Sequence, residues 1–219
     1  MKSLIESLLD DNLDDKLDKS IKDDIKAFLK KNYKDVESYK ISKTPNSDGK
    51  YEVSCLNDVV VKNKDIISLT NGLFTWGKVG GNFVCAICES LTSLEGAPKE
   101  IKGDFNCTYC SSLKTLKGAP KKIGRDFHCW NSKSLESLEG APKVVKGAFN
   151  CAYCKNLTSL KGAPEEVVGY FGCTGCEKLI SLKDAPKKVG GHFDCRLCKI
   201  KFTADDVKKF SNVKGNIIC

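Results

Sequence analysis

Apolar side chains recur along most of the chain at a fixed interval of 22 positions. Phenylalanine marks the interval at Phe83, Phe105, Phe127, Phe149, Phe171 and Phe193. Each phenylalanine follows a valine or isoleucine by four positions and precedes a cysteine by two. The unit reads [VI]-x-G-x-F-x-C-x-x-C-x-x-L-x-S-L-x-G-A-P-x-x, and six units fill residues 79–210 without an insertion. Such columns predict a stack of similar coils, in which like side chains lie above one another along the axis.

The apolar pattern inside one unit predicts its conformation. From the valine to the first cysteine, every second position holds the same residue type in nearly all units. This period of two is typical of a β-strand whose repeated residues face inward. The rest of the unit carries leucines and a Gly-Ala-Pro step, whose proline cannot donate to a β-ladder. A 22-residue coil leaves too little chain for a full helix, so we expect an extended return or a single 3₁₀ turn. The predicted fold class is a repeat solenoid of parallel β-strands and 22-residue coils.

The segments that flank the repeats have other patterns. Residues 1–35 predict an α-helical N-terminal element, with an apolar stripe that runs from Ile21 to Leu29. Residues 36–78 predict an N-terminal cap with short strands around a turn at Pro45–Gly49. The last unit contains Thr203-Ala-Asp-Asp206, which predicts a capping box for a short helix, and residues 211–219 predict a closing strand. The whole chain is expected to be α+β.

The repeat also resembles a known family. The phrase Phe-x-Cys-x-x-Cys followed by Leu-x-Ser-Leu resembles the leucine-rich-repeat signature L-x-L-x-x-[NC]-x-L, with one additional residue between the cysteine and the next leucine. The stretch Leu91–Cys107, LTSLEGAPKEIKGDFNC, is similar to repeats in uncharacterised proteins of tailed bacteriophages and some bacteria. This resemblance covers residues 79–219. It implies a leucine-rich-repeat-like solenoid that binds something, encoded by a phage or mobile element, and it brings no catalytic residues.

Composition narrows the class of protein. Of the 219 residues, 41% are hydrophobic and 8% aromatic, which supplies a core and argues against wholesale disorder. No apolar run approaches the roughly 18–20 residues of a membrane helix. The chain turns acidic soon after Met1, before a secretory apolar core develops. The expected location is the cytoplasm, and for a phage protein this means the cytoplasm of the host cell.

Thirteen cysteines raise the question of metal binding. The Cys-x-x-Cys pairs have eighteen residues between them, which matches the spacing of a zinc ribbon. The repeat accounts for this spacing without a metal, because cysteine packs as a small buried hydrophobe and Ser132 interrupts the second cysteine column. We therefore expect a structural ladder of cysteines and no cofactor, with zinc at the pairs and redox chemistry as alternatives. An odd number of cysteines also favours a reducing compartment over a disulfide framework.

The sequence contains no catalytic constellation. It has two histidines, and it lacks the Gly-x-Ser-x-Gly, Walker and His-Glu-x-x-His motifs. We therefore do not expect an enzyme.

Outward positions of the strand and of the adjoining turn vary from unit to unit and carry aromatic side chains. Repeat proteins acquire binding surfaces in this way, although an unconstrained surface would vary similarly. The candidate partner-binding residues are Asp104, Tyr109, Asp126, His128, Trp130, Tyr153, Tyr170, His192 and Arg196. Trp130 is the expected anchor, because an exposed tryptophan is typical of an interaction hot spot.

The distribution of charge supplies a rival interpretation. The net charge of +8 arises in residues 51–219, which hold 25 Lys or Arg against 17 Asp or Glu, while residues 1–50 hold 11 of each. The two positions after the proline of a unit are mostly basic, and stacking would align them into a ridge that attracts phosphates. The basic ridge comprises Lys99, Lys121, Lys122, Lys143, Lys187 and Lys188. Glu100, Glu165 and Glu166 interrupt it, and arginine is scarce.

These patterns together favour a non-enzymatic protein-binding repeat module. Its expected partner is a host or phage protein, for example a defence protein that the module inhibits. A virion-associated structural component is one alternative, and nucleic-acid binding through the basic ridge is a second.

Overall fold

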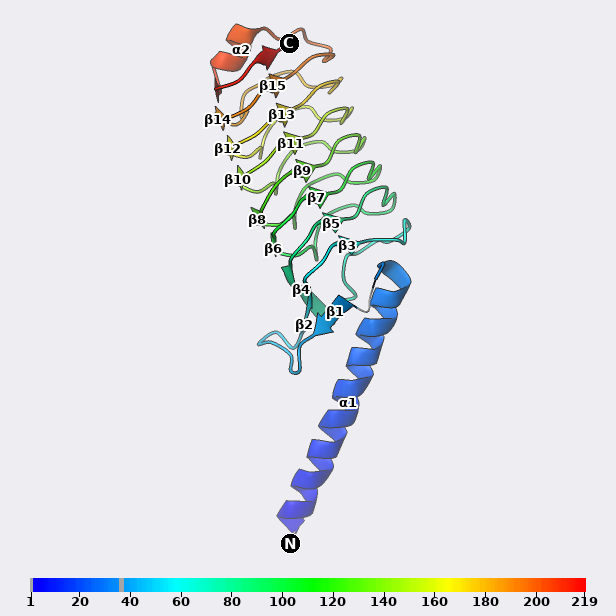
Figure 1. Ribbon diagram of the computed structural model, residues 1–219. Helices are drawn as coiled ribbons and strands as arrows, with labels where there is room; N and C mark the ends of the chain where they lie inside the picture. The colour runs from blue at the N-terminus through cyan, green and yellow to red at the C-terminus, as the bar shows by residue number, and fades with distance from the viewer. Residues whose placement is uncertain (1, 36–37) are drawn as a thin grey trace.

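The structure is a computed structural model that describes the backbone of residues 2–35 and 38–219 and the side chains of residues 16–35 and 38–219. The chain forms a stack of β-coils with a helix at each end (Figure 1). Helix α1 (Lys2–Asn32) extends away from the first coil, and the short helix α2 (Ala204–Lys208) lies at the opposite end of the stack. The repeat solenoid of parallel strands that the sequence predicts is confirmed.

Each coil contributes two short strands to parallel sheets on two sides of the stack. One side is formed by β4 (Phe74–Val79), β6 (Glu100–Ile101), β8 (Lys122–Ile123), β10 (Val144–Val145), β12 (Glu166–Val167), β14 (Lys188–Val189) and β16 (Asn212–Val213). The other side is formed by β3 (Val59–Val60), β5 (Phe83–Val84), β7 (Phe105–Asn106), β9 (Phe127–His128), β11 (Phe149–Asn150), β13 (Phe171–Gly172), β15 (Phe193–Asp194) and β17 (Ile217–Ile218). The second set is one eight-stranded sheet. The first set is divided between β8 and β10: its last four strands form a four-stranded sheet, and its first three belong to a five-stranded sheet that two earlier strands complete.

The five-stranded sheet begins before the regular repeats. Strand β1 (Tyr39–Ile41) pairs antiparallel with β2 (Tyr51–Cys55), and β2 pairs parallel with β4. The predicted turn at Pro45–Gly49 connects β1 and β2. Parallel coils therefore start near residue 51, where the 22-residue pattern is not yet visible in the sequence.

The register of the sheets follows the columns of the repeat. Phe105 pairs with Phe83 and Phe127, so neighbouring strands are offset by one whole unit. The prediction of one continuous strand from valine to cysteine is wrong, because the chain bends between the two strands, at Lys102 and Gly103 in the second unit. A Cβ atom on Gly103 would lie 2.7 Å from the backbone of Gly81, so this bend packs backbone against backbone between successive coils.

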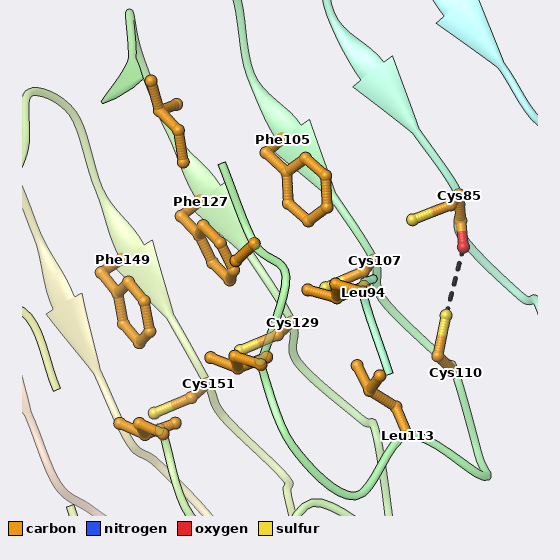
Figure 2. Packing of buried hydrophobic residues seen from close by; sticks show 14 of the residues in the cluster. Cys85, Leu94, Phe105, Cys107, Cys110, Leu113, Phe127, Cys129, Phe149 and Cys151 are labelled. Carbon is orange, nitrogen blue, oxygen red and sulfur yellow. Dashed lines mark hydrogen bonds between the residues drawn. The ribbon is translucent and has the colours of Figure 1, made fainter. Parts of the chain in front are cut away.

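A column of phenylalanine rings forms the centre of the core. Consecutive ring centroids, from Phe83 to Phe193, lie 5.8, 5.2, 5.0, 5.9 and 4.9 Å apart. Figure 2 shows Phe105, Phe127 and Phe149 in this column, beside the cysteines of the same coils. All of these rings are fully buried, and each burial contributes about 1.5–3 kcal/mol. The repeated apolar columns thus provide most of what holds one coil on the next.

Both ends of the stack are closed by helical segments. At the N-terminal end, Ile25, Leu29 and Tyr33 are buried against the first coils, and the Tyr33 hydroxyl donates to the Leu69 carbonyl at 2.6 Å. At the C-terminal end, the Asp206 carboxylate accepts from the Thr203 backbone N–H at 3.0 Å, and the Thr203 hydroxyl accepts from the Asp206 N–H. The predicted N-terminal helix, capping box and closing strand are confirmed.

Candidate interaction surface

From the second unit on, the second cysteine of a unit has a structural partner in the preceding coil. Its thiol donates a hydrogen bond to the carbonyl of the first cysteine, 25 residues earlier, as from Cys110 to Cys85 at 3.1 Å (Figure 2). The same bond joins Cys154 to the Cys129 carbonyl at 3.3 Å. Ser132 donates through its hydroxyl to the Cys107 carbonyl at 3.1 Å. This column therefore needs a small side chain with a donor hydrogen, which both cysteine and serine supply.

The first cysteine column is buried inside the stack. Burial raises the pKa of the thiols of Cys85, Cys107, Cys129 and Cys173 well above the usual range, which favours the neutral form. A metal ligand is the thiolate, so this environment opposes ligation. Within residues 16–35 and 38–219, no three His, Cys, Asp or Glu side chains are grouped so that they could hold a metal ion. The geometry supports packing and hydrogen bonding as the role of these thiols.

Two candidate partner-binding residues, Asp104 and Asp126, cap the bend of the next coil. Asp104 accepts from the Asp126 backbone N–H at 3.0 Å, and Asp126 accepts from the Ala148 N–H at 2.7 Å, both through Oδ1. Asn82 plays the same part for Asp104, at 2.7 Å. At the bend between the two strands of a coil, the side-chain oxygen accepts the backbone N–H that a carbonyl would accept in a regular β-ladder. One oxygen of each carboxylate is therefore engaged within the protein.

The two histidines differ in their surroundings. His192 lies near the C-terminal end, and its Nδ1 accepts from the Asn216 backbone N–H at 2.9 Å. His128 is half-buried, its Nε2 lies 3.7 Å from Asp126 Oδ2, and its buried Nδ1 has no hydrogen-bond partner in the described part of the chain. His192 thus has a role inside the fold, while His128 keeps one unused nitrogen.

A column of residues with positive φ follows the eight-stranded sheet. It comprises Ile87, Tyr109, Asn131, Tyr153, Gly175 and Leu197, with φ between 56° and 67°. We call it the left-handed strip. Its conformation is fixed by hydrogen bonds between coils. The first five members of the strip each donate a backbone N–H to the carbonyl of the residue 21 positions later, at 2.7–3.1 Å. A side chain in this region costs roughly 1–2 kcal/mol, which glycine avoids.

Four members of the left-handed strip are nevertheless large and exposed. Ile87, Tyr109, Tyr153 and Leu197 are 48%, 42%, 44% and 71% exposed. Neither the core nor the backbone requires these side chains, and Gly175 shows that the fold accepts glycine at this position. Exposed apolar groups retained at a conformational cost point to a functional surface.

Aromatic rings extend the left-handed strip across neighbouring coils. The rings of Tyr109 and Trp130 meet edge to face with centroids 4.5 Å apart. The ring of Tyr153 covers Gly175, where a Cβ atom would lie 2.5 Å from Tyr153 Cδ1. Tyr170 similarly covers Gly172, and burial, with the nearby Asp194 carboxylate, raises the pKa of Tyr170 to about 12.

An arginine with fixed orientation lies at the end of this surface. Arg196 holds the buried Asp194 through two bonds, Nη2 to Oδ2 at 2.7 Å and Nε to Oδ1 at 3.1 Å. The arginine itself is half exposed. Its guanidinium keeps donors for a partner, and the ion pair limits the entropy that binding would cost.

The structure thus pairs Tyr109 with Trp130 and places Tyr153, Tyr170 and Arg196 on the coils that follow. The side chains of Asp104, Asp126 and His192 accept hydrogen bonds from backbone N–H groups of the next coil. Ile87, Asn131 and Leu197 share the outward column of Tyr109 and Tyr153 but were not among the candidate residues chosen from the sequence. The signal was present, because glycine and asparagine in an otherwise apolar column indicate a left-handed backbone.

The basic ridge is partly neutralised by glutamates of adjacent coils. Lys122 lies 3.5 Å from Glu100, and Lys143 lies 3.3 Å from Glu165. Lys188 approaches Glu166 at 4.0 Å. The remaining ridge residues, Lys99, Lys121 and Lys187, have no ion pair within the described residues. The ridge is therefore a row of mixed charge and not an unbroken basic stripe.

No described helix has the length and apolar character needed to cross a membrane. No known protein family, curated protein or solved structure matches the chain. The grounds for a function therefore lie in the surface chemistry of the chain.

Proposed function

We propose that the protein is a non-enzymatic protein-binding module whose partner contacts the left-handed strip together with Trp130 and Arg196. The observation that carries this proposal is the presence of large exposed side chains at positions where the backbone favours glycine. The fold gains little from them, so their use lies in contact with another molecule.

The chemistry of the surface suits a protein partner. Tyrosine, tryptophan and arginine dominate the hot spots of protein interfaces, and all three occur here within a few coils. The side chains stand on a rigid stack, so their positions are set before binding and little ordering entropy is lost. The exposed aliphatic ends of Ile87 and Leu197 would extend the apolar contact at either end.

The resemblance of the repeat to those of phage proteins suggests the setting. We propose a host or phage protein in the cytoplasm as the partner, with inhibition of a host defence protein as one such role. A structural component of the virion is the alternative use of the same surface.

Replacement of two tyrosines by glycine tests the proposal. Tyr109→Gly with Tyr153→Gly removes both rings while the backbone keeps a conformation that glycine favours. We expect a specific protein partner, captured from host lysate in the presence of nuclease, to bind at least about tenfold more weakly, with no loss of melting temperature. Val144→Ala with Val168→Ala, at exposed apolar positions outside the strip, is the matched control. Undiminished capture by the tyrosine variant would show that the strip is not the binding surface.

Nucleic-acid binding through the basic ridge is the second candidate function. Lys99, Lys121 and Lys187 favour it, because no described carboxylate pairs with them. Lys121→Gln with Lys187→Gln should then weaken binding and flatten its salt dependence. Capture that survives nuclease and these substitutions argues for the protein-binding function.

A further inference from the structure

A thiol of the last repeat unit, Cys195, lies in direct contact with the thiol of Cys219 in the closing segment. The sulfur atoms of Cys195 and Cys219 are 3.0 Å apart. Both residues follow paired strands, since Phe193 and Asp194 of β15 pair with Ile217 and Ile218 of β17. Their side chains therefore project from adjacent positions on neighbouring strands, toward the same side.

Access to this pair differs from access to the other cysteines. Cys219 is exposed, whereas the remaining twelve cysteines, all within the described residues, are buried. Cys195 itself is almost fully buried. A reagent in solution can therefore reach Cys219 first, and Cys195 only through it.

The backbone already satisfies the requirements of a disulfide. Disulfides join residues whose Cα atoms lie about 4.4–6.8 Å apart, and neighbouring strands are separated by about 4.8 Å. Backbone bonds from Cys195 to Ile218 and from Phe193 to Asn216, both 2.9 Å, hold β15 and β17 at this spacing. A bond between the two sulfur atoms needs rotation of side chains and no displacement of a strand.

We propose that Cys195 and Cys219 are a modification site, at which a small-molecule disulfide such as oxidised glutathione forms a reversible internal disulfide. The Cys219 thiolate attacks one sulfur of the oxidant, which forms a mixed disulfide and releases one thiolate. Cys195 then attacks the Cys219 sulfur and its proton passes to the second departing thiolate. Two protein thiols are oxidised by two electrons, and one glutathione disulfide is reduced to two thiols.

The order of these steps follows from the surroundings of the pair. Burial raises the pKa of Cys195 well above its usual value, so this thiol is a poor first nucleophile in solution. Once Cys219 carries the mixed disulfide, the contact distance between the two sulfur atoms favours the second step.

The disulfide would close the segment from Cys195 to Cys219, which contains α2, β16 and β17. A link across a segment of this length restricts the unfolded chain. The oxidised C-terminal coils should therefore melt about 5 °C or more above the reduced ones. The site would thus couple the stability of the closing coil to the thiol–disulfide balance of its surroundings.

Peptide mapping of the full-length protein tests the proposal. The folded, reduced chain is incubated with oxidised glutathione, remaining thiols are alkylated, and the protein is cleaved at lysine and arginine, which separates Cys195 from Cys219. We expect one cross-linked peptide pair that joins these residues, lighter by two hydrogen atoms and accompanied by the rise in melting temperature. Cys219→Ser should abolish both effects, while Cys198→Ser, a neighbouring buried cysteine, should retain them.

Three results would overturn the proposal. One is a glutathione adduct on Cys219 that never resolves to the internal disulfide. Another is a cross-link between two chains through Cys219 at protein concentrations where the wild type is otherwise monomeric. The third is a cross-link of Cys219 to Cys198 in place of Cys195.

Discussion

Substitution of Cys154 tests whether the second cysteine column acts as a donor ladder or only fills space. The thiol of Cys154 is the hydrogen-bond partner of the Cys129 carbonyl, which accepts no backbone N–H in the described part of the chain. Cys154→Ala removes this donor, and Cys154→Ser keeps one. Ser132 already makes the equivalent bond one coil earlier, so the fold itself contains the conservative variant.

The expected cost has two parts. An unsatisfied buried carbonyl costs about 1 kcal/mol, at the low end of the usual range because a thiol is a weak donor. Removal of a packed sulfur atom costs about 1 kcal/mol more, as for a buried methylene. Cys154→Ala should therefore lower the free energy of unfolding by about 2 kcal/mol and the melting temperature by about 4–8 °C. Cys154→Ser should lose less than about 1 kcal/mol.

Urea unfolding under reducing conditions, followed by far-ultraviolet circular dichroism, measures both variants. Ser132→Cys is the reverse control and should fall within about 1 kcal/mol of the wild type. An unchanged slope against urea would show that the denatured state is the same in all variants. Equal losses for alanine and serine at position 154 would refute the reasoning, because volume alone would then account for the column.

The remaining predictions concern other columns of the repeat. Asp126→Ala should lower the free energy of unfolding by about 1–2 kcal/mol because it orphans the Ala148 N–H, whereas Asp126→Asn should keep the bond and stay within about 0.5 kcal/mol of the wild type in urea titrations. Tyr153→Gly should be more stable than Tyr153→Ala by about 1 kcal/mol, since the left-handed backbone penalises a Cβ atom; the opposite order in thermal melts would contradict the assigned φ. Burial raises the pKa of the Cys85 and Cys107 thiols above 9.0, so the unfolded chain ionises first as the pH rises. The free energy of unfolding should therefore be fully present below about pH 9 and fall at higher pH. A constant value up to about pH 11 in reducing buffer would count against this. The pKa of Asp206 is lowered to about 2 by the Lys209 ammonium and the Thr203 cap, so its carboxyl carbon should titrate near pH 2 by NMR, and the cap should weaken as the pH falls from about 4 toward 2.

The sequence predicts the stack of coils, but it does not predict the bend that divides the strand region of each coil. Columns such as Phe83 to Phe193 translate directly into strand register, because like side chains can stack only when each coil has the same length. The split of each strand in two was not predicted, since the alternating pattern continues through the bend. The bend depends on a backbone contact at Gly103 and on the Asp104 and Asp126 caps, which are properties of the stack and not of one unit.

The candidate surface was predictable in part. Tyr109, Trp130, Tyr153 and Arg196 stood out by residue type; the structure places the first three on consecutive coils and Arg196 two coils beyond Tyr153. Asp104 and Asp126 also have a role that the sequence did not predict, because the Oδ1 atom of each accepts a backbone N–H of the next coil. The left-handed conformation of Ile87 or Leu197 follows from hydrogen bonds between coils, so the residue alone could not reveal it.

Site-specific photo-crosslinking would test the central claim most directly. A benzophenone-bearing amino acid is introduced in turn at positions 109 and 197 of the left-handed strip, and at positions 144 and 168 as exposed apolar controls. The chain is then irradiated in nuclease-treated host lysate, and cross-linked proteins are identified by mass spectrometry. We expect positions 109 and 197 to label the same protein and the control positions to leave it unlabelled. Labelling of that protein only from positions 144 and 168 would contradict the account.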